Sequence, residues 1–392
     1  MEQVYLEKKD IIHRYLCTHH LYPRLPASEV LTVTRTLGFK ELSPTSYDIA
    51  LAARLEPLTH DVVNHQWNSN KVIRTLGVGR ETYIIPLNMW RVFNRPLAPL
   101  DESELQHLIP EIEPLIVALD TPLYQLYEVL IESARNVLSE KPMPQHNFYL
   151  ALSKAIIEKL APSKREVWLW PSTVGKEKTI GDSVIEALLP VISCSVPIAL
   201  EIVPGKPEYH YSLAHTSELP DTSELMRRFI HAHGPTDYEE LALWAHISPA
   251  HAKRLWLEFP QGALREVRWD DGLGYMLKED RESLKALPRI EGLRFIGSCD
   301  PLLGVKQRSL WVSGKTLFNY FFRSDDRPGM VLHDGEVVAG WYFRGKKKSF
   351  SLLIEDIGQP FGRIAKDELM AEISHMGDAL GMKNEGFSYI TR

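Results

Sequence analysis

The chain has 392 residues, of which 44% are hydrophobic and 24% are charged. This composition excludes a disordered or fibrous class, and the length exceeds what one hydrophobic core usually organises. The formal net charge of -6 argues against a protein that coats nucleic acid uniformly, because phosphate binding depends on Lys and Arg.

The cysteines and the N-terminal segment bear on the cellular compartment. Cys17, Cys194 and Cys299 lie far apart in the chain and form no C-x-x-C pair, so we expect neither a disulfide framework nor a redox motif. The charged N-terminal segment lacks the apolar stretch of a secretory signal, and no run reaches the roughly 18 apolar residues of a membrane span. We therefore expect a cytoplasmic protein that does not enter a membrane.

Residues 1–97 are expected to form a first winged helix. Val30, Val33 and Leu37 share one helical face, two more helices follow, and two strands then flank a glycine-containing turn. The helices are predicted at 28–37, 47–55 and 59–67, and the strands at 72–76 and 82–87.

Residues 98–218 are expected to form a second winged helix with a linker. The linker signals are the acidic, proline-bearing stretch 98–114 and the segment 214–222. The helices are predicted at 123–138, 144–160 and 181–189, and the strands at 198–203 and 209–213.

Residues 219–286 carry the clearest helix-turn-helix signal. Thr236 and Glu239 have the spacing of a capping box, and Ser248-Pro249 supplies an N-cap followed by proline at the first helical position. Together with an earlier helix at 223–233 and a hairpin at 263–277, these two helices predict a third winged helix. The second helix offers only Lys253 and Arg254 as basic residues, so it has few side chains that could recognise bases in the major groove.

Residues 287–392 change to a strand pattern. The turn Asp334-Gly335 between 330–333 and 337–343 predicts a type I′ hairpin, and a third strand follows at 350–354. Several short strands within about 70 residues predict a small sheet or barrel, and a final helix is predicted at 366–380.

Six segments of the chain resemble one family. They read LGFKELSP at 37–44, IALAARL at 49–55, GRETYIIP at 79–86, GPTDYEELALWAHIS at 234–248, RFIGSCDPLLGVKQRS at 294–309 and GMVLHDGEVVAGWYFR at 329–344. In this order and spacing they resemble the AlkZ-like winged-helix DNA glycosylases. The resemblance implies an α+β fold of three tandem winged helices followed by a C-terminal β-barrel. It also implies duplex DNA as the partner and hydrolysis of the N-glycosidic bond of alkylated bases as the family's reaction.

The family's catalytic triplet is replaced in this chain. Relatives carry Gln-x-Gln or Gln-x-Asp after a glycine-hydrophobic pair, whereas this chain has Lys40-Glu41-Leu42 after Gly38-Phe39. A charged lysine only donates hydrogen bonds and leucine offers none, so neither can accept one from an attacking water. Ile84 likewise stands where many relatives have histidine.

Two residues of the triplet admit hypotheses of their own. A desolvated Lys40 could lose its proton and attack a sugar carbon to form an imine, although a surface lysine is the commoner case. Glu41 could supply the missing acceptor only if it faces the pocket, and the alternation of side chains along the triplet argues against this.

Asp300 matches an aspartate that relatives keep at the corresponding place. Its position before Pro301 is more typical of a turn-forming residue than of a catalytic carboxylate, so a structural role is favoured.

Basic residues are concentrated in the C-terminal part. Between 306 and 348 there are nine Lys or Arg against four Asp or Glu, a local excess of five positive charges. Candidates for phosphate contact are Arg80, Lys306, Arg308, Arg344, Lys346, Lys347 and Lys348. The alternative is a basic face that serves only solubility.

Neither a metal nor a nucleotide cofactor is expected. The histidine pairs lack further ligands at zinc-like spacing, and the glycine-containing segments match neither a dinucleotide fingerprint nor a P-loop.

Three hypotheses about function remain. The first is a protein of this family that binds damaged or distorted duplex DNA without excision by the family mechanism. The second is an active DNA glycosylase with altered catalytic residues, and the third is a winged-helix scaffold that binds protein. The replaced triplet favours the first, with DNA contact by the first module and the loops of the C-terminal part.

Overall fold

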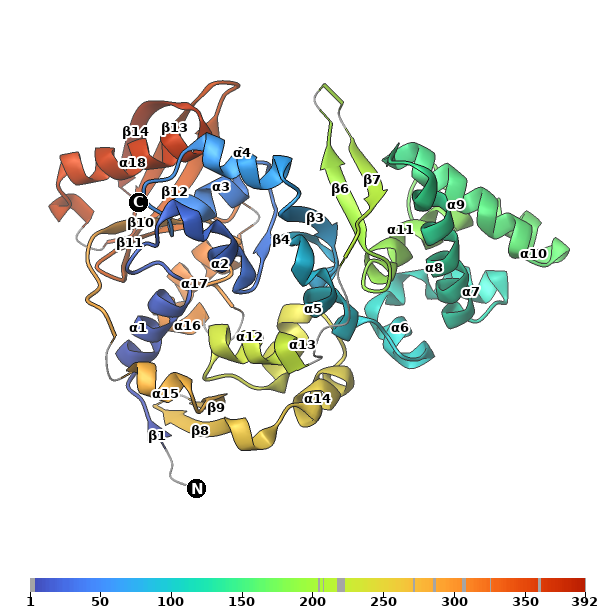
Figure 1. The fold of residues 1–392 in the computed structure, drawn as a ribbon, viewed down its shortest axis with the longest axis horizontal. Helices are drawn as coiled ribbons and strands as arrows, with labels where there is room; N and C mark the ends of the chain where they lie inside the picture. The colour runs from blue at the N-terminus through green and yellow to red at the C-terminus, as the bar shows by residue number, and fades with distance from the viewer. Residues whose placement is uncertain are drawn as a thin grey trace. The chain divides into compact units, whose positions relative to one another are not determined.

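The computed structural model has mixed α and β structure, which confirms the predicted α+β class (Figure 1). The residues it describes are 4–203, 205–206, 208–216, 223–270, 272–284, 287–304, 308–324, 326–358 and 361–391. The chain divides into two compact units that are both discontinuous in sequence. The first comprises Met1–Val72, Met226–Glu240 and Pro260–Arg392, and the second comprises Ile73–Leu225 and Leu241–Phe259.

The first unit holds a five-stranded sheet whose strands lie in the order β10-β11-β12-β13-β14. Their bounds are Leu293–Ile296, Gly329–His333, Glu336–Gly345, Ser349–Asp356 and Lys383–Thr391. The first four strands pair antiparallel, and β14 pairs parallel to β13 after the crossover helix α18 (Lys366–Leu380). At the β11–β12 turn, Asp334 and Gly335 have φ values of 50° and 83°, as the type I′ prediction requires.

This sheet is open, so the prediction of a small closed barrel was wrong. Strands β10 and β14 form its two edges, and they do not pair with each other among the described residues. The parallel pair β13–β14 requires a crossover, and α18 makes it while packing on the sheet through Leu369 and Ile373. Helices thus cover apolar faces that a barrel would enclose.

The opposite face of the same sheet packs against aromatic residues from two short helices. These helices are α16 (Arg308–Trp311) and α17 (Lys315–Phe322). Trp311, Tyr320 and Phe321 lie in one hydrophobic cluster with Met330 and Leu332 of β11.

The N-terminal part of the first unit consists mainly of helices. They are α1 (Lys8–Thr18), α2 (Val30–Arg35), α3 (Ser46–Ala52) and α4 (His60–Asn68), with the short strand β2 (Phe39–Lys40) between α2 and α3. A three-stranded sheet joins β1 (Val4–Tyr5), β8 (Leu264–Trp269) and β9 (Gly272–Leu277). The short helix α15 (Asp280–Ser283) follows β9.

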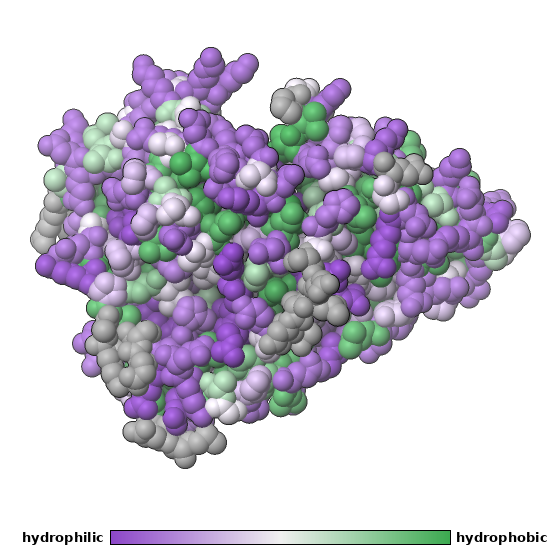
Figure 2. All heavy atoms as spheres, in the orientation of Figure 1, coloured by the Kyte–Doolittle hydropathy of each residue, from purple (hydrophilic) through white to green (hydrophobic). Residues whose placement is uncertain are grey.

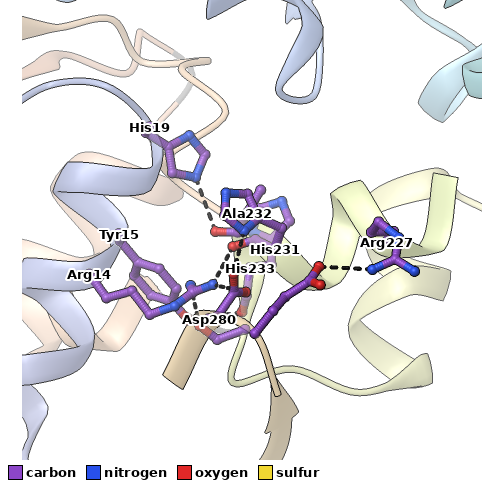
Figure 3. Close-up of polar contacts among 10 residues, drawn as sticks. Arg14, Tyr15, His19, Arg227, His231, Ala232, His233 and Asp280 are labelled. Atoms are coloured by element: carbon purple, nitrogen blue, oxygen red, sulfur yellow. Dashed lines mark hydrogen bonds and ion pairs between the residues drawn. The ribbon is translucent and has the colours of Figure 1, made fainter. Parts of the chain in front are cut away.

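A buried ion pair fastens α1 to the segment after β9 (Figure 3). Arg14 contacts Asp280 at 2.6 Å and also donates to the carbonyl oxygens of His231 and Gly234. The His231 ring shares a 2.7 Å hydrogen bond with the second oxygen of Asp280. His231 lies in the last turn of α12 (Ser223–His233), so the network ties three separate segments together.

The second unit contains a sheet with strands in the order β4-β3-β6-β7-β5. The strands are β3 (Val72–Leu76), β4 (Thr82–Pro86), β5 (Met143–Pro144), β6 (Ile198–Ile202) and β7 (Tyr209–Leu213). Between β4 and β6 the chain forms the helices α5 (Trp90–Asn94), α6 (Glu102–Leu108), α7 (Glu113–Leu119), α8 (Leu123–Glu140), α9 (Gln145–Lys159), α10 (Pro162–Trp168) and α11 (Ile180–Ile192).

The predicted pair of helices after residue 236 is present, with one correction at its start. Helix α14 (Pro249–Glu258) begins as predicted, because the Ser248 hydroxyl accepts from the backbone of His251 at 3.0 Å. Helix α13 (Tyr238–Ala245), however, is capped by Asp237 rather than Thr236. Thr236 is extended and exchanges two backbone hydrogen bonds with Tyr275 of β9, which moves the cap by one residue.

Hydrophilic residues cover most of the face shown in Figure 2, and hydrophobic residues appear on it in scattered patches. Over the described part of the chain, no helix combines the length and apolar character that crossing a membrane requires.

Candidate functional site

The first unit contains a cavity of about 460 Å³ beside the short strand β2. Its lining residues come from three stretches of the chain, within 39–50, 297–300 and 326–345. The first stretch includes Lys40-Glu41-Leu42, the second follows β10, and the third runs from the loop before β11 to the end of β12. The fold thus brings together segments that the sequence resemblance had singled out separately.

The triplet residues occupy one wall of this cavity in an alternating way. Lys40 and Leu42 line the cavity, whereas Glu41 is not among the lining residues. The Cys299 thiol approaches the Lys40 carbonyl oxygen at 3.6 Å, which holds the triplet against the segment that follows β10. Burial raises the pKa of this thiol to about 11.

Asp300 borders the same cavity, but its carboxylate is engaged by Arg54. The two guanidinium nitrogens donate to the two carboxylate oxygens at 2.8 and 2.6 Å, and both side chains are at most 1% exposed. The Leu302 amide also donates to Asp300 at 3.0 Å, as in a turn before proline. The carboxylate therefore supports local structure and presents no exposed oxygen to the cavity.

Hydroxyl groups stand next to the triplet. Ser43 Oγ lies 3.1 Å from Thr45 Oγ1 and 3.0 Å from Ser46 Oγ, and all three residues line the cavity. Hydroxyls both donate and accept hydrogen bonds, so this cluster gives the cavity the acceptors that the side chains of Lys40 and Leu42 lack. The exposed carboxylate of Asp326 lines the cavity as well.

Strand β12 contributes aromatic residues to the cavity that were not identified from the sequence. Trp341, Tyr342 and Phe343 all line it, and the Arg344 guanidinium lies 5.6 Å from the centre of the Tyr342 ring. Their sequence signal, an aromatic run inside a strand, is equally typical of a hydrophobic core. Trp341 also belongs to the hydrophobic core and Phe343 packs against it, so this strand contributes to both.

The predicted phosphate-contact residues fall into separate places. Arg344 lines the cavity, and the three lysines follow at the exposed β12–β13 turn, where Lys346 pairs with Glu385 at 2.8 Å. Arg308 is half-buried with its guanidinium over the Phe322 ring, and burial lowers its pKa, helped by the charge of Arg327.

Two other predicted contacts are not part of this group. Arg80 belongs to the second unit, where it faces Glu111 at 3.7 Å. Lys306 lies outside the described residues. The positively charged residues that line the cavity are therefore Lys40, Arg327 and Arg344, and the β12–β13 turn follows Arg344.

Within the described ranges, no group of three or more His, Cys, Asp or Glu side chains is arranged to hold a metal ion. The cavity chemistry is that of donors, hydroxyls, one exposed carboxylate and aromatic rings.

Comparison with known proteins places these features in context. The family model described as "DNA glycosylase AlkZ-like" matches residues 34–379. Among solved structures, the chain is similar to Streptomyces sahachiroi DNA glycosylase AlkZ, with a TM-score of 0.72 and 15% sequence identity. That similarity covers 99% of this chain and 100% of the other. No curated protein matches the chain in sequence.

Proposed function

Because the chain belongs to the AlkZ-like DNA glycosylase family, we propose that it binds duplex DNA at damaged or distorted sites without excising the base by the family's triplet mechanism. The main observation behind this proposal is the identity of the residues at the triplet position. Lys40 and Leu42 line the cavity where the family's acceptors are expected, and neither side chain can accept a hydrogen bond.

The chemistry of base excision explains why this substitution matters. An alkylated, cationic purine is already a good leaving group, so the protein must chiefly position a water and stabilise an oxocarbenium-like centre. Asp300 is a poor replacement, because activating a water would require it to leave its buried pair with Arg54. We therefore expect the protein to bind DNA, whereas the family's route to base hydrolysis lacks the side chains that would accept a hydrogen bond from the attacking water.

DNA contact is assigned to the positive residues around the cavity. Arg344 and the exposed Lys347 and Lys348 would neutralise backbone phosphates, and Arg80 would do so from the second unit. We also propose three winged helices, at 1–97, 98–218 and 219–286, followed by the sheet-containing region 287–392. In this arrangement the winged helices mainly support the fold and do not recognise bases.

A second candidate is an active glycosylase with altered catalytic residues. The hydroxyl cluster of Ser43, Thr45 and Ser46, together with Asp326, favours it, since these groups could accept a hydrogen bond from a water in the cavity. A Lys40 imine is the other route, and borohydride trapping on abasic DNA would detect it.

Two assays on the full chain separate these functions. Binding to a labelled duplex at increasing salt should weaken steeply if phosphates are contacted. An absence of salt-sensitive binding would refute the proposal and leave a protein-binding scaffold. Release of free base from an alkylated duplex would refute the non-excising proposal in favour of the active enzyme.

A further inference from the structure

Leu42 is a large hydrophobic residue that the fold leaves in contact with water. It is 53% exposed, and it lines the cavity beside β2. Single exposed leucines are common on protein surfaces, so exposure alone does not indicate a function. The position of Leu42 does distinguish it. Among the large hydrophobic residues that are at least 40% exposed in the described part of the chain, Leu42 alone lines this cavity.

Hydrogen bonds fix the backbone on both sides of Leu42. Before it, the Lys40 carbonyl oxygen accepts from the Cys299 thiol at 3.6 Å. After it, the Ser43 amide donates to Ser46 Oγ at 2.9 Å, and the Ser46 amide donates to the Ser43 carbonyl oxygen at 3.0 Å. The leucine side chain therefore projects from a segment that is already held in place, so little conformational entropy is lost when a ligand packs against it.

The cavity around this apolar side chain carries a positive charge. Its basic lining residues are Lys40, Arg327 and Arg344. Two carboxylates also line it, but that of Asp300 is neutralised by its buried pair with Arg54, which leaves Asp326 as the opposing charge. A ligand of complementary chemistry is apolar at its centre and anionic at its edges. The stacked bases and flanking phosphates of DNA have this chemistry.

We infer that Leu42 is a wedge, an apolar side chain that inserts between two stacked bases beside the distorted site, while the cavity's cations contact the flanking phosphates. The inference rests on the proposed function and gives a role to the residue that replaces one of the family's acceptors. Apolar wedges at other protein–DNA interfaces unstack a base step and kink the duplex. Because unstacking costs least where pairing is already broken, the wedge makes binding selective for distorted duplexes.

The test follows base unstacking with 2-aminopurine, whose fluorescence rises when it leaves the base stack. One duplex carries 2-aminopurine beside a single mismatch, and a fully paired duplex carries it at the same place. The wild-type protein should raise the fluorescence of the mismatched duplex. Leu42→Ala should abolish this rise and weaken binding to the mismatched duplex by about tenfold. The slope of log affinity against log salt should stay unchanged, because a wedge contacts no phosphate.

Two further variants serve as controls. Leu273 of β9 is 47% exposed in the same unit and is not a lining residue of the cavity, so Leu273→Ala should leave both the rise and the affinity unchanged. Leu42→Met keeps an apolar side chain of similar volume and should retain the rise. Equal urea midpoints for Leu42→Ala and the wild type show that the variant is folded.

Other outcomes would overturn the inference in distinguishable ways. If the wild type binds the mismatched duplex selectively but without a rise, or if Leu42→Ala gives the same rise, the inference is refuted and the proposed function stands. If Leu42→Ala flattens the salt slope, Leu42 acts by placing the phosphate contacts around it, and the inference is again refuted. If the wild type binds neither duplex, or binds both equally, the proposed function fails and the inference fails with it.

Discussion

Arg54 and Asp300 are 246 residues apart in the chain and form a two-bonded ion pair, with nitrogen-to-oxygen distances of 2.8 and 2.6 Å. Arg54 also donates to the carbonyl oxygens of His19 and Ala50. The pair joins the end of α3 to the segment after β10, which are the two sides of the cavity next to the triplet. Asp300 thus determines the shape of the site without presenting an oxygen to it.

We predict that Asp300→Asn destabilises the fold. Removing the carboxylate charge leaves a buried guanidinium uncompensated, a change that typically costs about 3–5 kcal/mol. Urea unfolding followed by circular dichroism measures the loss. An Arg54→Met/Asp300→Leu double variant should recover much of it, since both charges are then gone. Unchanged stability in Asp300→Asn, together with lost DNA binding, would argue for a direct role in the site instead.

Charge reversal at the β12–β13 turn should weaken DNA binding. Lys347→Glu/Lys348→Glu removes two exposed positive charges beside the cavity-lining Arg344, and the slope of log affinity against log salt should flatten by about two. Lys141→Glu/Lys176→Glu is a control with the same charge change at exposed lysines of the second unit. Equal slopes for the wild type and the turn variant would show that this turn does not contact DNA.

Features fixed by neighbouring residues were predictable from the sequence. The Asp334-Gly335 turn has positive φ at both residues, and α14 begins at Ser248-Pro249, because both depend on chemistry within four residues. The resemblance also located the triplet, although only the structure shows that Lys40 and Leu42 face one cavity.

Features fixed by distant partners were not predictable in this way. Thr236 has the sequence of a cap, but its pairing with Tyr275 across the fold moves the cap to Asp237. The short strands of the C-terminal part suggested closure, yet α18 brings β14 in parallel and leaves the sheet open. Likewise, no local pattern places the Tyr320 hydroxyl of α17 against Gly340 of β12. The proposed domain bounds remain predictions.

The thiols should react slowly in the folded protein. Burial raises the pKa of Cys17 and Cys299 to about 11 and that of Cys194 to about 12. At pH 8 about one Cys299 thiol in a thousand is then ionised, and only the thiolate attacks iodoacetamide. We expect alkylation at pH 8 to be at least about a hundredfold slower than after unfolding in urea, and to accelerate as pH rises toward 11. Mass spectrometry reports each site, and rapid labelling of native Cys299 would contradict its burial.

The ion pair of Arg14 with Asp280 should contribute far more stability than its exposed neighbour. Burial alone would raise the pKa of Asp280, but hydrogen bonds and charges of His231 and Arg14 outweigh it and lower the pKa below 3.8. Asp280→Asn leaves Arg14 buried without a counter-charge and should cost about 3–5 kcal/mol. Arg227→Gln breaks an exposed pair with Glu279 nearby and should cost less than about 1 kcal/mol (Figure 3). Similar unfolding free energies for the two variants would refute the assignment.

Two buried histidines should make stability depend on pH below neutrality. Burial, followed by the charge of Arg14, lowers the pKa of His233 to about 3, and burial also lowers that of His19, which lies edge-on to His233. The folded state therefore keeps both rings neutral, while the unfolded chain takes up protons below its ordinary pKa near 6.5.

The sign of the effect follows from proton uptake. Since the unfolded state binds more protons, the free energy of unfolding is highest above pH 6.5 and falls as pH drops from there toward the folded pKa. Each histidine should contribute a slope approaching about 1.4 kcal/mol per pH unit between pH 6 and the folded pKa, which is about 3 for His233. Urea unfolding at pH 7, 6, 5 and 4 measures this slope. His233→Gln removes one titrating ring without adding charge, so its slope should be shallower by that amount, and an unchanged slope would show that His233 titrates normally in the fold.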